Sequence, residues 1–356
     1  GWHSSDTAQL RFDGVRVPQR YRIGEEGAGF RAIMTNWQDY LPRMVFADWL
    51  DEHRVIGRGY PSPFPGPWRT DRTPYLREIM DCLSSTSPVE EIVFMKGAQV
   101  GGTEAILNAL GYVIDHAPGP VIFIQPTVDL AKRFSRQRLE PLVDVTPRIR
   151  EKVAPARSRD GANTMLAKDF PGGQLVITGA NSAVGLRSMP AQYAFMDEID
   201  GYPVNVDEEG SPIALVEARQ RTFARRKRAK VSTPTIKGRS RVWAWLESSD
   251  FQQWFCACPA CGHRQVWMWK DVKWSDGDPS DAHLECERCG KKLSDAERKE
   301  SVAGGEWRAT KPFNGVRGFW INGINSLFAA KKGFTSRLHQ AAAEFLAAKK
   351  EGPAAL

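Results

Sequence analysis

The chain has 356 residues, of which 42% are hydrophobic and 26% charged, enough for two or three domains with a sizeable core. It contains no run of 18 apolar residues and no signal-peptide order at its N-terminus, which argues against a membrane span and a secretory leader. Forty-nine basic and 42 acidic residues leave a net charge of +7, which favours a polyanionic partner.

Residues 1–40 differ in composition from the rest of the chain. Two pieces of this segment, Gly1 to Pro18 and Ile23-Gly-Glu-Glu-Gly-Ala-Gly-Phe30, resemble an internal part of an acyl-CoA dehydrogenase. So short a segment cannot build a flavin site or a core of its own. We therefore expect an extraneous fragment without flavin chemistry, not an independent domain, with a junction near residues 37–43.

Residues 41–250 alternate short apolar runs with helical patterns. The apolar runs predict buried strands at 91–95, 121–125, 175–178, 193–196 and 229–233, and the periodicity predicts helices over 103–114 and 129–142. Strands that alternate with helices indicate an α/β fold with a mostly parallel sheet and helices on both faces. Ligands of such sheets bind beyond the carboxyl ends of the strands, where the motifs below lie.

A glycine-rich loop, Lys96-Gly-Ala-Gln-Val-Gly-Gly-Thr103, joins the first strand to its helix. The standard phosphate loop is G-x-x-x-x-G-K-[ST], but here Lys96 holds the first position and Gly102 the usual lysine position. Glycines let backbone N–H groups turn toward an anion at the positive end of a helix. Thr103 can offer its hydroxyl to Mg²⁺, and Lys96 can reach the β- and γ-phosphates. An ordinary strand-to-helix turn is the alternative.

Two carboxylates end the strand Tyr193-Ala-Phe-Met196. Asp197 suits magnesium coordination, and Glu198 can polarise a water for attack on a γ-phosphate. The alternative is an ordinary acidic loop after a buried strand. However, the two carboxylates follow the glycine loop in the order and at the spacing that a nucleotide hydrolase shows. The next strand ends in Ser232-Thr-Pro-Thr235, whose hydroxyl groups can sense hydrolysis, although such a group alone usually marks a turn.

Together these motifs resemble the lambda-like GpA branch of the phage terminase large subunits, in which an early lysine in the phosphate loop is itself usual. The matching pieces are the loop 96–103, Met196-Asp-Glu-Ile-Asp200 and Val231-Ser-Thr-Pro-Thr235. In addition, Pro67-Trp-Arg-Thr-Asp-Arg-Thr-Pro-Tyr75 resembles that family's segment before the ATPase core. The likeness extends from about Leu41 to the C-terminus.

The resemblance implies a P-loop NTPase-type ATPase domain over residues 41–250. The loop would bind ATP and Mg²⁺ through Lys96, Gly97, Ala98, Gln99, Val100, Gly101, Gly102 and Thr103. Asp197 becomes the metal-site carboxylate and Glu198 the catalytic one. The coupling motif comprises Ser232, Thr233, Pro234 and Thr235. Tyr75 is a candidate for stacking on adenine, with core packing as the alternative, and Arg187 is a candidate charge stabiliser, with a surface arginine as the alternative.

The same resemblance implies a motor that packages double-stranded DNA in the cytoplasm of a bacterial host. Its partners would be a small terminase subunit, the portal of the procapsid and further copies in a homo-oligomeric ring. The family's nuclease domain should lie beyond residue 356, so we expect residues 301–356 to form a bridge toward it and do not expect endonuclease activity here. Two rival interpretations are a helicase-type or remodelling ATPase and a non-catalytic, zinc-dependent DNA-binding module with a decayed nucleotide site.

Residues 251–300 contain two matched knuckles, Cys258-Pro-Ala-Cys261-Gly and Cys286-Glu-Arg-Cys289-Gly. Each presents two thiolates in a tight turn, and four thiolates close a tetrahedral structural site for Zn²⁺. A redox pair is the alternative, which the presence of two matching knuckles disfavours. Cys256 is a fifth thiol that this site does not need.

A run of seven basic residues falls between Arg219 and Lys230. The plain interpretation is a solvated helix face or loop. The functional one is a strip that holds the phosphates of duplex DNA without reading its sequence, because each neutralised phosphate releases counterions.

Overall fold

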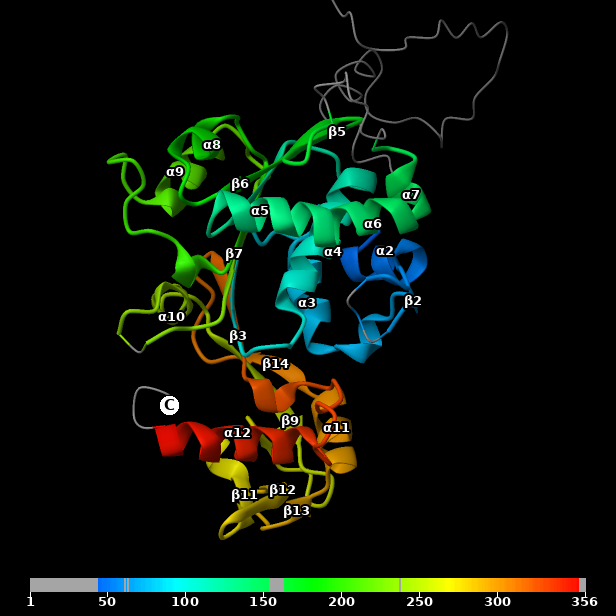
Figure 1. Cartoon of the computed structure of the whole chain (residues 1–356), viewed down its shortest axis with the longest axis vertical. Helices are drawn as coiled ribbons and strands as arrows, with labels where there is room; N and C mark the ends of the chain where they lie inside the picture. Colours follow the sequence, from blue (N-terminus) through cyan, green and yellow to red (C-terminus); the bar gives the residue numbers. More distant parts are fainter. Residues whose placement is uncertain (1–43, 61, 63, 154–162, 237, 352–356) are drawn as a thin grey trace, which may run out of the picture. The chain divides into compact units, whose positions relative to one another are not determined.

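The computed structural model describes residues 44–60, 62, 64–153, 163–236 and 238–351, and the acyl-CoA-dehydrogenase-like segment lies outside them. From Met44 onward the chain forms one compact unit (Figure 1). Its helices are α2 (Phe46–His53), α3 (Tyr75–Cys82), α4 (Gly102–Asp115), α5 (Val128–Phe134), α6 (Glu140–Val145), α7 (Pro147–Arg150), α8 (Ala183–Arg187), α9 (Pro212–Arg219), α10 (Arg241–Glu247), α11 (Asp295–Ala303) and α12 (Arg337–Glu351). Short turns of other helix types are η3 (Thr70–Arg72), η4 (Ser135–Leu139), η5 (Ile199–Gly201), η6 (Trp269–Asp271) and η7 (Gly323–Asn325).

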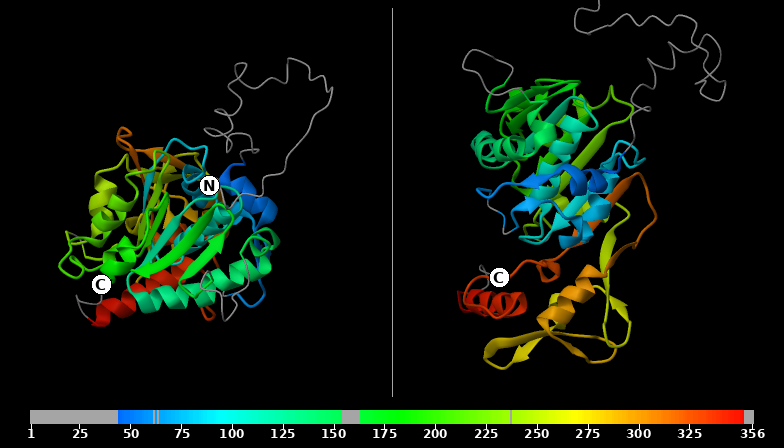
Figure 2. Two further views of the ribbon diagram at one scale, coloured as in Figure 1. Left: turned by 90° about the horizontal axis from the view of Figure 1, so that it is seen from above. Right: turned by 90° about the vertical axis from the view of Figure 1, so that its right-hand side faces the viewer.

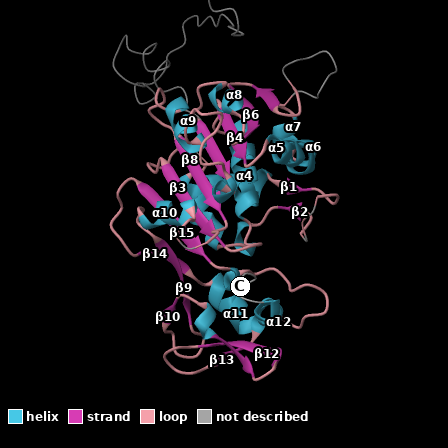
Figure 3. Ribbon diagram, turned by 60° about the vertical axis from the view of Figure 1, so that its left-hand side comes forward, coloured by secondary structure: helices cyan, strands magenta, loops and turns pink. Residues whose placement is uncertain are grey.

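A ten-stranded sheet organises the unit (Figure 3). Its strands are β3 (Glu91–Lys96), β4 (Val121–Gln125), β5 (Ala167–Phe170), β6 (Gly173–Gly179), β7 (Tyr193–Asp197), β8 (Lys227–Ser232), β9 (Gln252–Ala257), β10 (Arg264–Gln265), β14 (Glu306–Ala309) and β15 (Val316–Ile321). The order is β10-β9-β15-β3-β8-β7-β4-β6-β5, with β14 also on β9. All pairs from β9 to β6 are parallel. Strand β8, which leads into Ser232 to Thr235, therefore lies between β3, which precedes the glycine-rich loop, and β7, which ends in Asp197.

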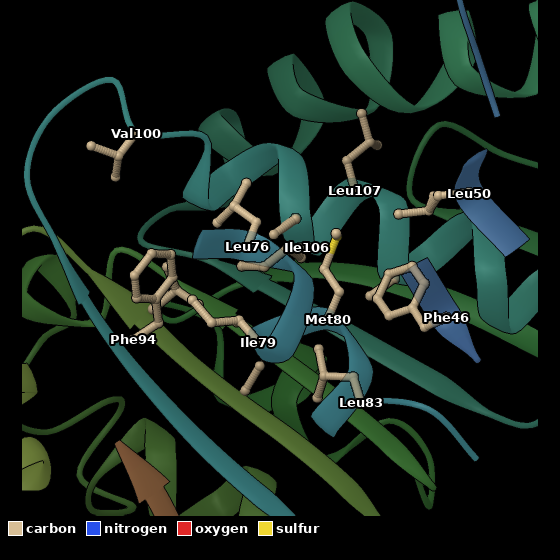
Figure 4. Packing of buried hydrophobic residues seen from close by; sticks show 14 of the residues in the cluster. Phe46, Leu50, Leu76, Ile79, Met80, Leu83, Phe94, Val100, Ile106 and Leu107 are labelled. Carbon is tan, nitrogen blue, oxygen red and sulfur yellow. The ribbon is translucent and has the colours of Figure 1, made fainter. Parts of the chain in front are cut away.

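Two hydrophobic cores cover the two faces of this sheet, because side chains alternate along each strand. On β3, Phe94 points into the core beneath α2, α3 and α4, whereas Val93 and Met95 point into the core beneath α8, α9 and α10. Figure 4 shows the first core, where Ile79 of α3 lies beside Phe94 and residues of α2, α3 and α4 extend the cluster away from it. Because the central strands are buried on both faces, their sequences are continuous apolar runs, which is why those runs predicted them. The views in Figure 2 show these helices around the sheet.

The predicted mixed α/β fold is confirmed, and the five predicted strands correspond to β3, β4, β6, β7 and β8. The predicted helix over 103–114 corresponds to α4. The helix predicted over 129–142 is instead interrupted, because the π-helical turn η4 stands between α5 and α6. Such a turn inserts one residue into the helical register and shifts which side chains face the sheet.

The sheet does not end at residue 250, where we placed the boundary of the ATPase domain. Strand β9 comes from the expected zinc module, and β14 and β15 come from the expected bridge. Strand β15 pairs in parallel with β3 along its whole length, from Val316 opposite Glu91 to Ile321 opposite Lys96. The expected bridge therefore supplies a strand that neighbours the phosphate loop. Periodicity alone did not disclose this pairing, because more than two hundred residues separate the two strands.

Two small sheets complete the unit: β1 (Val55–Ile56) with β2 (Gly66–Pro67), and the antiparallel set β11 (Val272–Ser275), β12 (Asp278–Glu285) and β13 (Lys292–Leu293). Helix α12 packs beside β12, and its Phe345 meets Trp269 and Trp274. Among the described helices, none combines the length and the apolar character that crossing a membrane requires.

Candidate functional site

The glycine-rich loop turns sharply between β3 and α4. Gly101 caps α4 with a left-handed backbone, φ 89°, and Gln99 also has a positive φ of 58°. The loop is fixed from the far end of the chain, since the Gly97 amide donates to the carbonyl of Ile321 at 2.8 Å. The Ser326 hydroxyl donates to the carbonyl of Gln99 at 3.1 Å. Fourteen residues long, α4 directs its positive end at this loop, which suits an anion.

Lys96, the last residue of β3, reaches across two neighbouring strands. Its Nζ atom lies 2.7 Å from Oε1 of Glu198 and 3.2 Å from Oγ1 of Thr233. The side chain is almost buried, at 8% exposure. Three motifs predicted separately from the sequence therefore meet at one ammonium group.

Asp197 ends β7 directly beside the first turn of α4. Its Oδ2 atom accepts hydrogen bonds from Thr103 Oγ1 at 3.2 Å and from Gln125 Nε2 at 3.0 Å. Its Oδ1 atom is buried and has no partner among the described residues. The adjacent hydroxyl and carboxylate are hard oxygen ligands of the kind Mg²⁺ takes, directly or through water, and the unpartnered oxygen leaves one ligand position free.

Burial raises the pKa of Asp197 to about 6, against the opposing effect of Lys96. Because folding raises this pKa, ionised Asp197 destabilises the metal-free fold above pH 6, and that cost fades as the pH falls toward 4. We expect Asp197→Asn to raise the free energy of unfolding by roughly 1–3 kcal/mol at pH 7.5 in magnesium-free buffer, and by much less at pH 4.5. Urea denaturation at both pH values measures this.

The exposed carboxylate Asp129 supplies the control for that measurement. Its replacement by asparagine should leave the free energy of unfolding nearly unchanged at both pH values. A stabilisation by Asp197→Asn that grew toward acid pH would contradict the assignment.

Glu198 directly follows the strand with a left-handed backbone, φ 53°, which is costly for a residue with a side chain. This turn directs the carboxylate back over the end of β8, where Oε2 accepts the Thr233 amide at 3.1 Å and Oε1 holds Lys96. The carboxylate remains 38% exposed, so water can reach it. It is therefore placed as a base that a water molecule could approach.

The segment from Ser232 to Thr235 meets a carboxylate that we did not single out from the sequence, Asp200. Its Oδ2 atom accepts both the amide and the hydroxyl of Thr235, each at 2.9 Å. Its Oδ1 atom accepts the Val242 amide at 2.8 Å, in the first turn of α10. The amide of Asp200 itself donates to Ser232 Oγ at 3.2 Å, whereas Pro234 is exposed. As the third carboxylate in the four residues from Asp197, directly after a buried apolar run, Asp200 carried a signal that could have revealed it.

Steric contacts explain why lysine and glycine have exchanged places in this loop. A Cβ atom on Gly102 would lie 2.2 Å from Cδ and 2.6 Å from Cε of Lys96, so the lysine stem occupies the space that a side chain at 102 would need. A Cβ atom on Gly97 would lie 2.4 Å from the backbone nitrogen of Gly323. A side chain at position 102 would therefore displace the stem of Lys96 from its observed position.

A cavity of about 670 Å³ opens beside the loop. Its lining includes Lys96, Gln99, Val100, Gly101, Gly102 and Thr103 from the loop, together with side chains from residues 56–76, 138 and 328–330. Tyr75 is not part of the lining. It is fully buried and packs edge-on against Trp254, so its ring has no open face for adenine, and core packing is its observed role.

Arg187 also lies apart from the cluster of Lys96 and Glu198. It ends α8, where its guanidinium pairs with Glu209 at 2.8 Å and remains 46% exposed. The structure does not bring it to the loop within this chain.

Three of the seven basic residues from Arg219 to Lys230, namely Lys227, Arg228 and Lys230, lie in strand β8 and are largely buried, whereas Arg221 and Arg225 are exposed. Lys227 is buried, its ammonium donates to three backbone carbonyls within residues 82–89, and burial lowers its pKa to about 8. Lys230, 0% exposed, and Arg228 share two carboxylates at 2.6–2.9 Å. The expectation that this run forms a phosphate-holding strip is therefore wrong for these positions, because strand β8 buries them.

The four knuckle cysteines converge as predicted. Their sulfur atoms all lie within 4.8 Å of one another, with Cys258 to Cys289 and Cys261 to Cys286 both at 3.8 Å. A tetrahedral zinc ion with Zn–S bonds of about 2.3 Å requires a sulfur separation of about 3.8 Å, so the donor set fits that metal. Cys256, by contrast, is buried and contacts Asn325, which leaves it a core residue.

A mostly parallel sheet with a glycine-rich loop, a buried lysine and two carboxylates at its carboxyl edge defines an α/β protein of the nucleotide-binding class. The chain belongs to the family described as phage terminase large subunit gpA, ATPase domain, whose model matches residues 62–307.

Two curated relatives are terminase large subunits. That of Enterobacteria phage P21 is 28% identical over 275 residues, 74% of this chain and 41% of the relative. That of Escherichia phage lambda is 28% identical over 230 residues, 62% of this chain and 35% of the relative. The chain thus spans about two fifths of the length of these relatives. Among solved structures, a large terminase ATPase domain of Thermus phage P74-26 is 12% identical, with 72% of this chain and 82% of that chain covered and a TM-score of 0.36.

Proposed function

We propose that this chain is the ATP-hydrolysing part of a DNA-packaging motor of the terminase large-subunit type, a P-loop NTPase that binds ATP and Mg²⁺ between β3 and α4. The observation that carries the proposal is the meeting of Lys96, Glu198 and Thr233. Beside it, the hydrogen bond from Thr103 to Asp197 joins the loop to the acidic strand end.

In this proposal each side chain has a role that follows from its contacts. Thr103 and Asp197 would hold Mg²⁺, which neutralises charge on the β- and γ-phosphates. When ATP binds, the Lys96 ammonium group would leave the carboxylate of Glu198 and bind phosphate oxygens instead. Glu198, released from the lysine, orients a water molecule and takes its proton as the water attacks the γ-phosphate. Thr233 contacts both Lys96 and Glu198, so its position would change when these two side chains separate.

Hydrogen bonds connect Glu198 with helix α10, so a movement of this carboxylate can be transmitted to the helix. Thr235 lies two residues after Thr233 and is held by Asp200, which also accepts the Val242 amide in the first turn of α10. A shift of residues 232–235 on hydrolysis would therefore move α10. This path supports the role of Ser232 to Thr235 as the coupling motif.

Duplex DNA needs an exposed basic surface, and α5 with η4 provides one. Lys132, Arg133 and Arg136 are exposed on one side of this helical segment, with Asp129 as the neighbouring acid. On the other side of the same segment, Arg138 lines the cavity and donates to Tyr60 at 3.0 Å. We place the DNA backbone on the exposed side, so that binding there can influence the nucleotide cavity.

We expect duplex DNA to stimulate ATP hydrolysis by the full chain, and a variant with glutamine at positions 132, 133 and 136 to lose most of that stimulation. Removing one bond to a DNA phosphate should lower the salt dependence of DNA binding by about one unit of slope. Phosphate release with and without DNA, at several salt concentrations, measures both effects. A matched control replaces Lys332, Lys349 and Lys350 by glutamine, which removes equal charge elsewhere.

Equal DNA stimulation of the two triple variants would contradict this placement of the DNA. Strand separation on a forked duplex would favour the helicase alternative, and nucleotide binding without turnover, even with DNA, would favour the non-catalytic one. The partners of such a motor belong to the same proposal, namely a small terminase subunit, a procapsid portal and further copies in a ring within the bacterial cytoplasm.

The four cysteines are proposed to hold a structural Zn²⁺ in a module of zinc-ribbon type. Matching backbone geometry supports this, because Gly262 donates to Cys258 and Gly290 to Cys286, each at 2.9 Å, with φ of 69° and 68°. Four thiolates leave no open position for catalysis.

We expect about one zinc ion per chain, and almost none after Cys286→Ser, because three thiolates no longer close the site. Elemental analysis of the purified protein gives the ratio, and thermal unfolding should begin earlier in the variant. Cys256→Ala is the control, since this thiol lies outside the cluster. Zinc retained in full by Cys286→Ser would exclude the four-thiolate site.

A further inference from the structure

The cavity beside the phosphate loop has a second group of lining residues that phosphate binding does not use. Phe64 and Arg72 come from the segment before β3, and Phe328 follows β15. We infer that these three side chains stack on the base of the bound nucleotide, so that the site holds a nucleoside triphosphate and not merely a polyphosphate. This inference rests on the proposed function.

The three side chains already form a stacked cluster. The rings of Phe64 and Phe328 lie 6.0 Å apart at an interplanar angle of 28°. The Arg72 guanidinium lies 5.0 Å from the centre of the Phe64 ring. A flat base between two rings needs about 7 Å, at about 3.5 Å for each contact, so the two rings would have to separate to admit it. Phe64 is 37% exposed, which leaves its ring accessible from the cavity.

Charge in the cavity fits the rest of such a ligand. The charged side chains of the lining are Lys96, Arg69, Arg72, Arg138 and a single acid, Glu104. Glu104 is held by the buried Arg54 at 3.2 Å and by the Tyr60 hydroxyl at 2.6 Å, so its charge is already neutralised. Neither Arg69 nor Arg72 forms an ion pair with a carboxylate in the part of the chain that the structure describes. The excess of positive charge suits a triphosphate, and the aromatic cluster suits its base.

Size and the position of Tyr75 support the same assignment. At about 670 Å³ the cavity falls within the range of small-molecule sites, and it exceeds what phosphate groups alone would fill. Tyr75, the aromatic residue that the sequence offered for the base, has no open face. Since stacking on an aromatic face tolerates every base, the cluster would recognise the base by its flat surface.

The experiment compares ATP with tripolyphosphate, which carries the phosphates without a base. Dissociation constants for both are measured on the full chain with Mg²⁺, for the parent, Phe64→Ala and Phe328→Ala. We expect each variant to bind ATP at least tenfold more weakly and tripolyphosphate within about twofold of the parent, as removal of one stacking ring implies. Phe64→Tyr keeps a ring face and should retain most of the ATP affinity, which distinguishes stacking from folding.

Phe313 supplies a matched control, because it is 52% exposed, carries Arg317 5.5 Å from its ring centre and lies outside the cavity. Phe313→Ala should change neither constant. Equal weakening of ATP and tripolyphosphate by the cavity variants, or no weakening of ATP, would overturn the inference. Lys96→Ala should weaken both ligands. If the parent hydrolyses ATP and Phe64→Ala binds ATP normally, only the base site is overturned. If the parent binds no ATP, the proposed function is overturned as well.

Discussion

Glu198→Gln should reduce ATP turnover by roughly 10²–10⁴-fold while ATP binds as tightly as before or more tightly. The loss follows from removal of the base that would take a proton from the attacking water. The retained or improved affinity follows from the ion pair between Glu198 and Lys96 at 2.7 Å, which the phosphates must otherwise displace. Single-turnover phosphate release and a dissociation constant for ATP, measured on the same preparation, separate these two effects.

The matched control for that experiment is Glu209→Gln, which breaks the pair with Arg187 away from the loop. Turnover should then stay within about threefold of the parent, as for an ordinary surface pair. A Glu198→Gln variant that hydrolyses ATP at the parental rate would remove the catalytic role of this carboxylate, whatever its affinity.

Gly102→Ala should lower turnover by about 100-fold, although it adds a single methyl group. The new Cβ would take the space of the Lys96 stem and push the ammonium group away from the phosphates, and loss of one charge stabiliser typically costs this much. In a Lys96→Ala background the same change should be nearly silent, because nothing remains for it to displace. The double-mutant cycle therefore isolates the contact between the two positions.

Two further variants sharpen this test. Gly59→Ala, where a Cβ would meet no atom within 4 Å, should be silent in both backgrounds. The exchange Lys96→Gly with Gly102→Lys restores the standard loop order without the clash, and it should recover more turnover than Gly102→Lys alone. If Gly102→Ala lowers turnover equally with and without Lys96, the glycine is needed for the backbone conformation of the loop and not for the position of the lysine.

Local patterns predicted the parts of the site that a few consecutive residues determine. The strand ends at Lys96 and Asp197 follow from apolar runs, and the four cysteines from their spacing. What the sequence could not disclose depends on register between distant strands. It did not show that Lys96 would hold Glu198, or that Asp200 would join Thr235 to α10.

The wrong expectations have the same physical cause. The basic run at 219–230 looked like a surface because it is charged, yet β8 carries Lys230 into the sheet, where Glu91 and Glu217 compensate it. The family resemblance made Tyr75 a candidate for stacking on adenine, yet its ring is fully buried and packs against Trp254. In each case one partner, Glu91 or Trp254, comes from a remote part of the chain, so local composition could not reveal the burial.

The anchoring of the phosphate loop by residues after β15 bears on how this protein can be divided for experiments. Arg298 of α11 donates to the carbonyls of Ile324 and Ser326, and Ser326 in turn bonds Gln99 in the loop. The family match ends at residue 307, ahead of this anchor and of β15. An expression fragment cut at that limit would expose the open edge of β3 and release the loop, so the boundaries of sequence similarity should not be used as cloning boundaries.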